Sequence, residues 1–410
     1  MSGGFSRRGV LAGAGGAAAL AVLPQGAWAA SSGRLADAAV PITPAEHMGR
    51  IAKLQGLMAE QGVAALLVES GSSLTYFTGV RWSRSERITA AVIPAKGQPI
   101  VVTPFFEAPS VRETLAVPAD LRTWHEDASP FALIADALKG RPGPVAVEQT
   151  TRAFITEGLA REGRIQVVSG AGLVNACRQI KSPAELALME IANAITLAAL
   201  REAHKAVQPG MTGADLGALV DGATTRMGGQ SDFAMALLNE ASAYPHGSRS
   251  PQVVREGSVI LMDCGCTVAD YQSDISRTWV YGAPSARQRK VWDTVRRGQD
   301  RVFGAARVGT PASALDAAVR GFYEGEGWGP VFALPGLSHR AGHGIGMDGH
   351  ESPYLVGSDQ TPLAPGMCFS NEPGLYIPGE FGMRLEDCWV MTDAGPKSFT
   401  PLARSLDDPI

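Results

Sequence analysis

The chain has 410 residues, a hydrophobic fraction of 45%, a charged fraction of 19% and a formal net charge of −4. This length predicts two domains. The mixed charge argues against a nucleic-acid surface and against a basic patch for anionic membranes. Beyond the N-terminus we find no apolar run long enough to span a bilayer, so no transmembrane segment is expected.

The first thirty residues have the pattern of an export signal. Two arginines follow Ser6, an Ala/Gly-rich apolar run comes next, and this run ends in Ala27-Trp28-Ala29. A charged start, an apolar core and a small-residue cleavage site are typical of secretory signals. Paired arginines indicate twin-arginine export. We expect residues 1–29 to be this signal and the mature protein to be periplasmic; the alternative is a fortuitous Arg-Arg pair before a disordered tail.

Residues 43–180 alternate between helical and strand patterns. An amphipathic helix is expected over 45–60. Its apolar face would consist of Met48, Ile51, Leu54 and Met58. Four short apolar runs, ALLV at 65–68, the TYFTG segment, ITAAVIP and PIVVTP, are expected to be buried strands. The pattern predicts an α/β N-terminal domain.

A second domain is expected over residues 181–405. It opens on a strong helix start, with Ser182 as N-cap, Pro183 at the first helical position and Glu185 at the third. The segments that begin at Gly210 and Gly309, 99 residues apart, share Gly, Leu, Ala and Val at the same offsets. This echo indicates two related halves, although two ordinary helix starts after a glycine would also produce it.

Four acids and one histidine of the second domain form a candidate metal-ligand set. They are Asp263, Asp274, His343, Glu372 and Glu386. Carboxylate and imidazole ligands of this number suit two divalent cations that share oxygen bridges. Apolar residues precede Asp263 and Glu372, which favours burial over ordinary exposed positions. Burial of four carboxylates without cations would be prohibitive.

The acids fall into two pairs. A hairpin centred between Val268 and Ala269 would place Asp263 directly opposite Asp274. Because Val-Ala is a poor two-residue turn, we expect a longer loop, with Asp270 at positive φ.

The same counting of residues on either side of a turn applies to the second pair of acids. Glu372 and Glu386 are centred on Gly379, which lies in a Pro-Gly turn signal. They too should face each other across a hairpin. Two facing carboxylates repel unless a cation lies between them.

Histidine and cysteine are distributed unevenly. Three of the seven histidines, His339, His343 and His350, lie within twelve residues, which favours a site over an isolated structural histidine. The five cysteines are Cys177, Cys264, Cys266, Cys368 and Cys388. Their odd number and the absence of a CxxC pair argue against a zinc ribbon or a disulfide framework. We expect buried thiols, with a Cys368–Cys388 disulfide as the alternative.

Taken together, these motifs resemble the pita-bread metallopeptidases of family M24, the group of aminopeptidase P, prolidase and methionine aminopeptidase. The match is D-x-G-x(8)-D, H-G-I-G-x-x-x-H-E, N-E-P-G and R-L-E-D in that order, with R-x-I-K-S-P-A-E upstream at 178–185. It covers residues 45 to 400. The resemblance implies a creatinase-like α/β domain followed by an α+β pita-bread catalytic domain with an internal pseudo-twofold.

The resemblance also implies residue roles. Asp274 and Glu386 would bridge two divalent cations, Asp263 would complete one site, and His343 and Glu372 would complete the other. Mn is favoured by the hard ligands, with Co or Zn as alternatives. Glu372 would also be the general base. The further roles implied are catalytic assistance by His246 and His350, and substrate binding by His339, His350 and Arg384. Arg384 would also support the site, and it could pair with a substrate carboxylate.

The implied activity is hydrolysis of the N-terminal Xaa-Pro bond of peptides by a water bridging two divalent cations. The leading α/β domain counts against methionine aminopeptidase, and the complete ligand set counts against creatinase-like members and a silent binding module. Two alternatives stay open: a prolidase restricted to dipeptides, and a hydrolase of another small amide or ester. A homo-oligomer, dimer or tetramer, is expected from the same resemblance.

Overall fold

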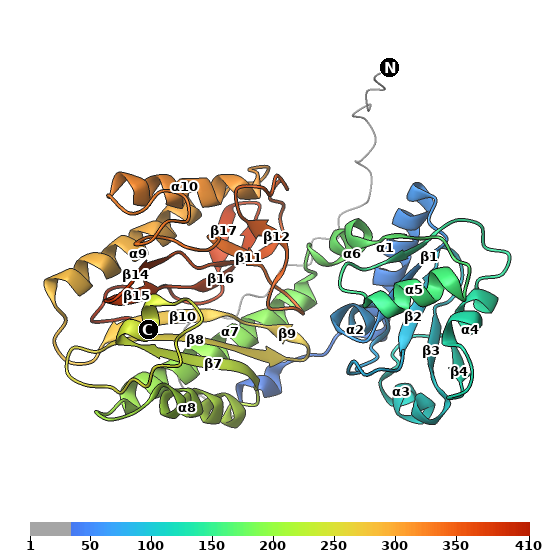
Figure 1. The fold of residues 1–410 in the computed structure, drawn as a ribbon, viewed down its shortest axis with the longest axis horizontal. Helices are drawn as coiled ribbons and strands as arrows, with labels where there is room; N and C mark the ends of the chain where they lie inside the picture. Colours follow the sequence, from blue (N-terminus) through green and yellow to red (C-terminus); the bar gives the residue numbers. More distant parts are fainter. Residues whose placement is uncertain (1–33) are drawn as a thin grey trace, which may run out of the picture. The chain divides into compact units, whose positions relative to one another are not determined.

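The computed structural model describes residues 34–410. The predicted signal peptide at residues 1–29 lies outside the described residues and stays a prediction. The N-terminal region holds a six-stranded sheet of order β4-β3-β2-β1-β5-β6 (Figure 1). Its strands are β1 Ala65–Glu69, β2 Ala90–Pro94, β3 Ile100–Pro104, β4 Asp120–Trp124, β5 Val145–Val147 and β6 Val167–Ser169. The β1–β2 and β2–β3 pairs are antiparallel, and the other three pairs are parallel.

Helices surround this sheet. They are α1 Pro44–Gln61, α2 Ser72–Thr78, α3 Ala108–Thr114, α4 Pro130–Ala137, α5 Ala153–Arg161 and α6 Ala171–Arg178, with a 3-10 turn, η3, at Phe105–Glu107. A capping box at Thr43 and Glu46 starts α1. Its predicted apolar face is confirmed except at Met48, which is 42% exposed; His47 is buried instead.

The TYFTG segment is a helix, and its prediction as a strand was wrong. Helix α2 begins after Gly71 and ends at Gly79, whose φ of 78° supplies a left-handed cap. Six of its residues are buried. A short run that is buried on all sides has no periodicity from which helix and strand can be told apart.

The second region contains four long helices and three sheets. The helices are α7 Pro183–Ala206, α8 Gly213–Arg226, α9 Ala286–Ala305 and α10 Ala312–Gly325, with 3-10 turns η2 at Leu35–Ala38 and η4 at Asn239–Ala243. The strands are β7 Gln230–Leu238, β8 Val259–Val268, β9 Tyr271–Gln272, β10 Ile275–Val280, β11 Gly342–Gly344, β12 Glu351–Leu355, β13 Cys368–Asn371, β14 Gly374–Ile377, β15 Phe381–Arg384, β16 Asp387–Thr392 and β17 Gly395–Ser398. The sheet orders are β10-β8-β7 with β9 on β8, β12-β11-β13-β16-β17, and β14-β15.

This region is built from two similar halves, as the sequence echo predicts. Helices α8 and α10 both have 14 residues. Each is preceded by a glycine whose N–H bonds a distant backbone carbonyl at 2.8 Å: Gly210 to Val254, and Gly309 to Leu363. In Figure 1, α7 and α8 lie on one side of the strands and α9 and α10 on the other. One core cluster joins α7 and α8 to β8 and β10, and another joins α9 and α10 to β13–β16.

Helix α7 carries the length and apolar composition of a membrane span, which the sequence analysis did not recognise. Its most apolar window is 61% buried inside the protein. Leu197, Leu200 and Ala203 of this helix belong to the core cluster with β8 and β10. A capping box at Ser182 and Glu185 starts it as predicted. The helix is therefore a core helix.

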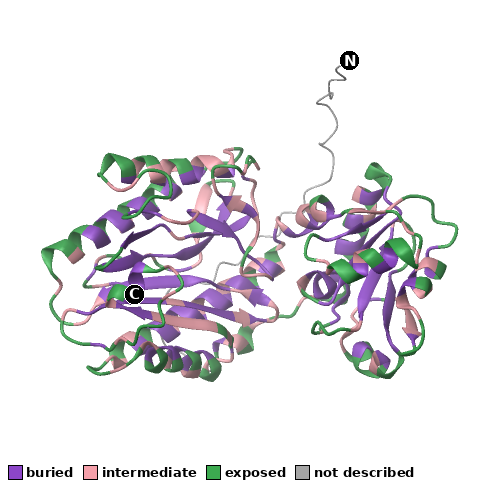
Figure 2. Cartoon of the chain, viewed as in Figure 1, coloured by how far each residue is buried: buried purple, intermediate pink, exposed green. Residues whose placement is uncertain are grey.

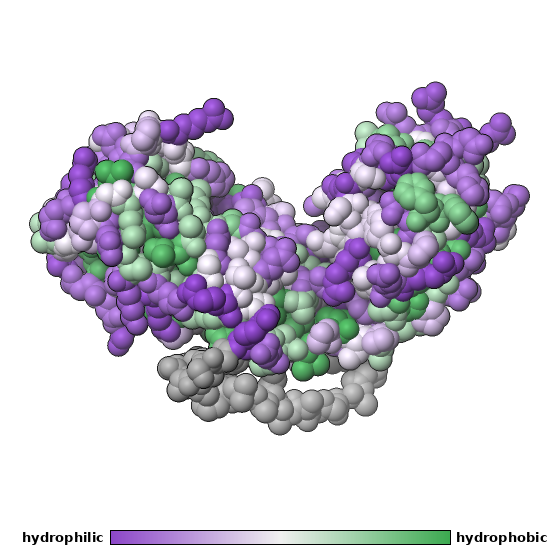
Figure 3. Space-filling view, turned by 90° about the horizontal axis from the view of Figure 1, so that it is seen from below, coloured by the Kyte–Doolittle hydropathy of each residue, from purple (hydrophilic) through white to green (hydrophobic). Residues whose placement is uncertain are grey.

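Buried residues are concentrated in the strands of each region. Figure 2 shows most strands of both regions coloured as buried, whereas β7 is mainly intermediate and the outward sides of α8, α9 and α10 are exposed. On the face drawn in Figure 3, hydrophilic side chains predominate, and hydrophobic ones form separate small patches. All five cysteines are buried free thiols. Cys368 pairs with Val390 and Cys388 with Ser370, so the two thiols are not opposite and the alternative disulfide is absent from the structure.

The segment between α6 and α7 contacts the catalytic region through a buried ion cluster. Arg178 donates to Glu351 at 2.6 Å and to Asp348 at 2.8 Å. Lys181 donates to the other Glu351 oxygen at 2.6 Å. Its two cationic neighbours overcome the effect of burial and hold the pKa of Glu351 below its ordinary value. The R-x-I-K part of the upstream motif therefore anchors the start of β12.

Candidate metal centre

Asp263 and Asp274 come from the β8–β10 hairpin, in a register that differs from the predicted one. Asp263 lies opposite Ser276, and Val268 pairs with Tyr271. The turn is therefore Ala269-Asp270, a two-residue loop in which both residues have positive φ, 45° and 75°. The positive φ at Asp270 is confirmed, but the longer loop and the direct Asp263–Asp274 opposition were wrong. Because the register shift is two residues, both carboxylates still project from the same face.

The Glu372–Glu386 pair follows its predicted register. Asn371 pairs with Asp387 on one side, and Gly374 pairs with Arg384 on the other. The two glutamates occupy the interval between these ladders, centred on the turn at Gly379, which has φ 78°. The predicted opposition of Glu372 and Glu386 is confirmed.

His343 reaches the acids from β11. Its backbone N–H donates to Ser370 Oγ at 3.0 Å, and its Nδ1 lies 3.1 Å from the Gly344 carbonyl oxygen. A carbonyl accepts only from a protonated nitrogen, so Nδ1 carries the hydrogen and Nε2 keeps its lone pair. Nε2 lies 3.3 Å from Glu372 Oε1, 3.7 Å from Asp274 Oδ2 and 3.9 Å from Glu386 Oε1.

The five side chains form overlapping clusters of donor atoms. Asp263, Asp274 and Glu386 offer oxygens within 4.8 Å of one another, and His343, Glu372 and Glu386 offer a second such group. A third group consists of Asp274, His343 and His350. Glu386, Asp274 and His343 each belong to two groups. This overlap is what two neighbouring cations with shared carboxylates require.

The burial and the charge of these five side chains fit a bound cation. Asp274, His343 and Glu386 are buried, and the side chains of Asp263 and Glu372 are each 13% exposed. Among the described residues, Asp274 Oδ1 and Glu386 Oε1 are buried acceptors without a hydrogen-bond partner. These are the two residues expected to bridge metals. Unpartnered buried carboxylate oxygens are costly unless an ion satisfies them.

Burial also shifts the protonation of these groups in the metal-free protein. It raises the pKa of Asp274 and of Glu386 well above the ordinary range, with neighbouring carboxylates adding to the effect. Burial raises the pKa of Glu372 to about 7, against the opposing charge of Arg384. Burial and the neighbouring His350 lower the pKa of His343, which keeps that imidazole neutral. A neutral imidazole is the form that binds metals.

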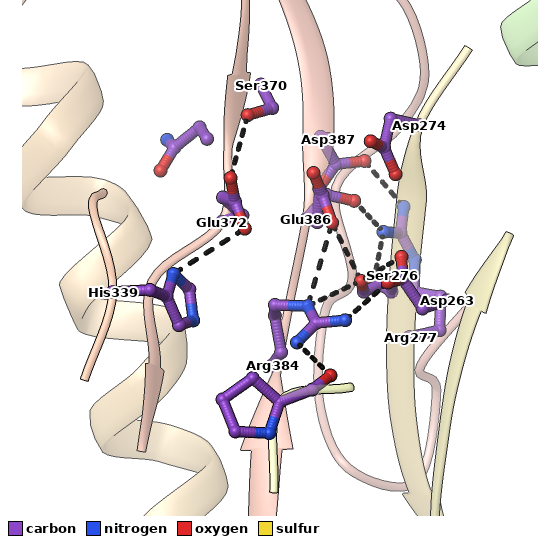
Figure 4. A network of polar contacts seen from close by, with 12 residues as sticks. Asp263, Asp274, Ser276, Arg277, His339, Ser370, Glu372, Arg384, Glu386 and Asp387 are labelled. Atoms are coloured by element: carbon purple, nitrogen blue, oxygen red, sulfur yellow. Dashed lines mark hydrogen bonds and ion pairs between the residues drawn. The ribbon is translucent and has the colours of Figure 1, made fainter. Parts of the chain in front are cut away.

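Arg384 supports the acids from β15, and Figure 4 shows its guanidinium beside Asp263 and Ser276. Nη2 forms a short ion pair with Asp263. Nε donates to Ser276 Oγ at 2.9 Å, and Nη1 donates to Tyr376 Oη at 2.9 Å. Arg384 is only 3% exposed. It is a structural partner of the ligand cluster.

Three residues around the acids were missed by the sequence analysis. Ser276 Oγ lies 2.8 Å from a carboxylate oxygen of Asp263 and 2.8 Å from one of Glu386. Behind Glu386, the fully buried Arg277 donates to the Glu386 carbonyl at 2.8 Å and to Asp387 at 2.6 Å. Figure 4 shows this second layer. Two of these residues could have been found from their position in the sequence, because Ser276 is two residues beyond Asp274 and Asp387 directly follows Glu386.

The remaining predicted histidines line the same cavity. His339 Nδ1 donates to the Arg340 carbonyl at 2.8 Å, and its Nε2 accepts from Tyr376 Oη at 2.7 Å. The His350 ring stacks on the His343 ring with centroids 3.8 Å apart. His246 is exposed at the cavity wall. The cavity has a volume of about 460 Å³ and includes all five candidate ligands, a size typical of small-molecule sites.

Comparison with known proteins identifies the family. The model of metallopeptidase family M24 matches residues 187–393, and the model of the creatinase/prolidase N-terminal domain matches residues 50–180. The chain belongs to metallopeptidase family M24. Its two-domain fold, predicted from the motifs, is thereby confirmed, and the chain is a metallopeptidase.

Individual M24 proteins resemble this chain over most of their length. The probable dipeptidase PepE of Mycobacterium tuberculosis is 32% identical over 85% of this chain and 93% of its own. The Xaa-Pro dipeptidase of Lactobacillus helveticus is 29% identical over 86% of this chain and 97% of its own. The crystal structure of PepE from Mycobacterium ulcerans superposes with a TM-score of 0.81 at 31% identity, covering 88% of this chain and 97% of the other.

Proposed function

We propose that this M24 metallopeptidase hydrolyses the bond between an N-terminal residue and a following proline, with two divalent cations held by Asp263, Asp274, His343, Glu372 and Glu386. The observation that carries this proposal is the pair of overlapping donor clusters that share Glu386 in one cavity. The unpartnered oxygens of Asp274 and Glu386 support the bridging roles. Mn suits the oxygen-rich set best.

The chain's own residues account for the proton transfers of this reaction. Divalent cations at the site would supply the positive charge that acidifies a water and polarises the scissile carbonyl. Glu372 would take the proton of the attacking water and pass it to the leaving proline nitrogen. Its carboxylate is held by Ser370 Oγ at 3.3 Å and faces the cavity.

The three other histidines of the cavity would contact the substrate. His350 and His246, both at the wall of the cavity, would donate to the oxygen that becomes negative as the carbonyl is attacked. His339, locked in one tautomer by the Arg340 carbonyl and Tyr376, would line the pocket for the proline ring.

Xaa-Pro specificity is supported by the relatives, of which three are named Xaa-Pro dipeptidases. Two substrate lengths are compatible with this activity, long peptides and dipeptides. A metal hydrolase of another small amide or ester is the second candidate.

The test is a substrate panel with metal analysis. The purified protein is loaded with Mn, Co or Zn and offered Xaa-Pro dipeptides, longer Xaa-Pro peptides and matched Xaa-Ala controls. We expect about two metal ions per chain and turnover of Xaa-Pro substrates in preference to the Xaa-Ala controls. Equal turnover of the Xaa-Ala controls, or no turnover with any of the three metals, would reject the proposal.

A further inference from the structure

The pairing of β13 with β16 ends next to the two glutamates of the candidate metal centre. Asn371 and Asp387 form the last pair of this ladder. The chain then diverges, because the Glu372 N–H donates to the Ala341 carbonyl at 2.9 Å, and the Glu386 N–H donates to a carbonyl of β10 at 3.0 Å. The N–H groups of the two glutamates therefore do not bond across the hairpin. Their segments are held together by the contacts on either side of them.

One side chain of α9 bridges the two strands at this point. The Nε2 amide group of Gln299 donates to Asp387 Oδ2 at 2.8 Å and to the Asn371 carbonyl at 3.2 Å. In return, Asn371 Nδ2 donates to the Gln299 backbone carbonyl at 3.0 Å. Gln299 is fully buried. It thus bonds both the residue that precedes Glu372 and the residue that follows Glu386.

The orientation of the Gln299 amide follows from its partners. Both groups at Nε2 are acceptors, a carboxylate and a carbonyl, and the NH2 group has two hydrogens to donate. The amide oxygen accepts a short bond from Arg296, which can only donate. An amide turned the other way would lose all three bonds and would place its oxygen against the Asp387 carboxylate. The bridge between the strands therefore has one defined geometry.

The two strands depend on this bridge to different degrees. Arg277 also donates to Asp387 at 2.6 Å and to the Glu386 carbonyl at 2.8 Å, so β16 has a second anchor. Among the described residues, the Asn371 side chain bonds only Gln299, and its Oδ1 is a buried acceptor without a partner. Loss of the Gln299 amide should therefore release the end of β13 more than the start of β16.

We propose that Gln299 is a positioning residue of the metal centre, which fixes the place of Glu372 relative to Glu386. This role rests on the proposed binding of two cations. Glu372 belongs to the donor group that contains His343 and is absent from the group that contains Asp263. Gln299 should accordingly control the metal affinity of the first group, the His343 position, and affect the second, the Asp263 position, much less.

The test is a calorimetric titration of the metal-free protein with Mn, which requires no substrate. Glu372→Gln identifies the His343 position as the binding event that this variant weakens. Gln299→Met keeps the length of the side chain but has no amide. It should weaken the same event by roughly tenfold and the other event by less than about threefold, because residues that orient metal ligands typically contribute 10- to 100-fold to affinity.

The matched control is Thr294→Val. Thr294 is also buried on α9, but its hydroxyl donates to the Lys290 carbonyl of the same helix at 2.8 Å. We expect both Mn affinities of this variant to equal those of the wild type. If Gln299→Met does not fold, Gln299→Asn takes its place. Its amide is one methylene too short to bond both strands, and it should show the same selective loss.

Three results would overturn the assignment: unchanged Mn affinities in the Gln299 variant, an equal loss in both binding events, or a Glu372→Gln variant that weakens both events equally. If the wild type binds a single Mn, the two-cation function fails. The positioning role of Gln299 then stands only if Gln299→Met weakens that one event by roughly tenfold while Thr294→Val leaves it unchanged; any smaller effect would reject it.

Discussion

Ser276 lies directly opposite Asp263 in the β8–β10 pair, and its hydroxyl oxygen is 2.8 Å from both the Asp263 and the Glu386 carboxylates. A hydroxyl has one hydrogen to donate, so it orients one acid at a time. Residues that orient ligands in this way typically contribute 10- to 100-fold to metal affinity. We predict that Ser276→Ala lowers Mn affinity by about tenfold, measured by calorimetric titration of the metal-free protein. Ser231→Ala, on the neighbouring strand β7, is the control; an equal loss in both variants would contradict the prediction.

Glu372→Gln should impair proton transfer while leaving the fold intact. The amide keeps the shape of the side chain but cannot accept a proton, so we expect kcat to fall by roughly 10²- to 10⁴-fold. The measurement is steady-state turnover of an Xaa-Pro substrate at saturating Mn, with the metal content of each sample determined. Glu380→Gln, an exposed residue in the turn of the same hairpin, should leave kcat unchanged. A near-wild-type rate for Glu372→Gln would exclude it as the base.

The metal-free protein should become less stable as pH rises. Burial raises the pKa of Asp274, Glu372 and Glu386 above their ordinary values, so the folded state binds more protons than the unfolded chain. The stability that protonation supplies is complete below the ordinary pKa and is lost as pH rises through the folded one. For Glu372 this window runs from its usual 4.5 to about 7. The lowered pKa of the buried His343 acts in the opposite direction below its usual 6.5. The melting temperature of the chelated protein should therefore fall between pH 7 and pH 8, where only the acids still titrate.

Asp274→Asn tests the origin of this instability. It removes one buried charge, so the chelated variant should melt about 2 °C above the chelated wild type at pH 8. Added Mn should stabilise the wild type but not this variant, because a candidate bridging ligand is missing. Glu60→Gln, on the exposed side of α1, should melt like the wild type. A chelated wild type whose melting temperature rises with pH would contradict the electrostatic argument.

Removal of Glu351 should be costly for folding. Its carboxylate neutralises Arg178 and Lys181, whose side chains are 9% and 2% exposed. Breaking a buried pair leaves an uncompensated charge, which typically costs about 3–5 kcal/mol. We predict a loss of this size for Glu351→Gln in urea unfolding of the metal-free protein. Asp407→Asn breaks the exposed pair with Arg289 and should change the unfolding midpoint little. A loss below about 1 kcal/mol for Glu351→Gln would show that this pair behaves like a surface pair.

The ligand set was predictable because its residue types and spacing are tied to chemistry. The Glu372–Glu386 opposition followed from a turn signal at Gly379 and counting along both strands, and the structure has that register. The register of the first hairpin was misjudged by two residues. Its turn uses Ala269 at positive φ beside Asp270, and an alanine does not mark such a turn in a sequence. The prediction that Asp263 and Asp274 project from the same face was still correct, because side chains on a strand alternate with period two.

Other features lay beyond sequence reasoning. Helix α2 was taken for a strand because a segment of six buried residues carries no periodicity. The part played by Arg384 depends on which carboxylate its guanidinium reaches, and only the three-dimensional arrangement shows that this carboxylate is Asp263.

The division of the catalytic region into two similar halves has a consequence for how the protein acquires its metals. One half contributes Asp263 and Asp274, and the other contributes His343, Glu372 and Glu386. Contacts between residues so distant in sequence form slowly, because a long loop must close first. Neither hairpin alone offers a complete coordination sphere. Metal uptake during refolding should accordingly report the docking of the halves, and it should lag behind the appearance of helices and strands.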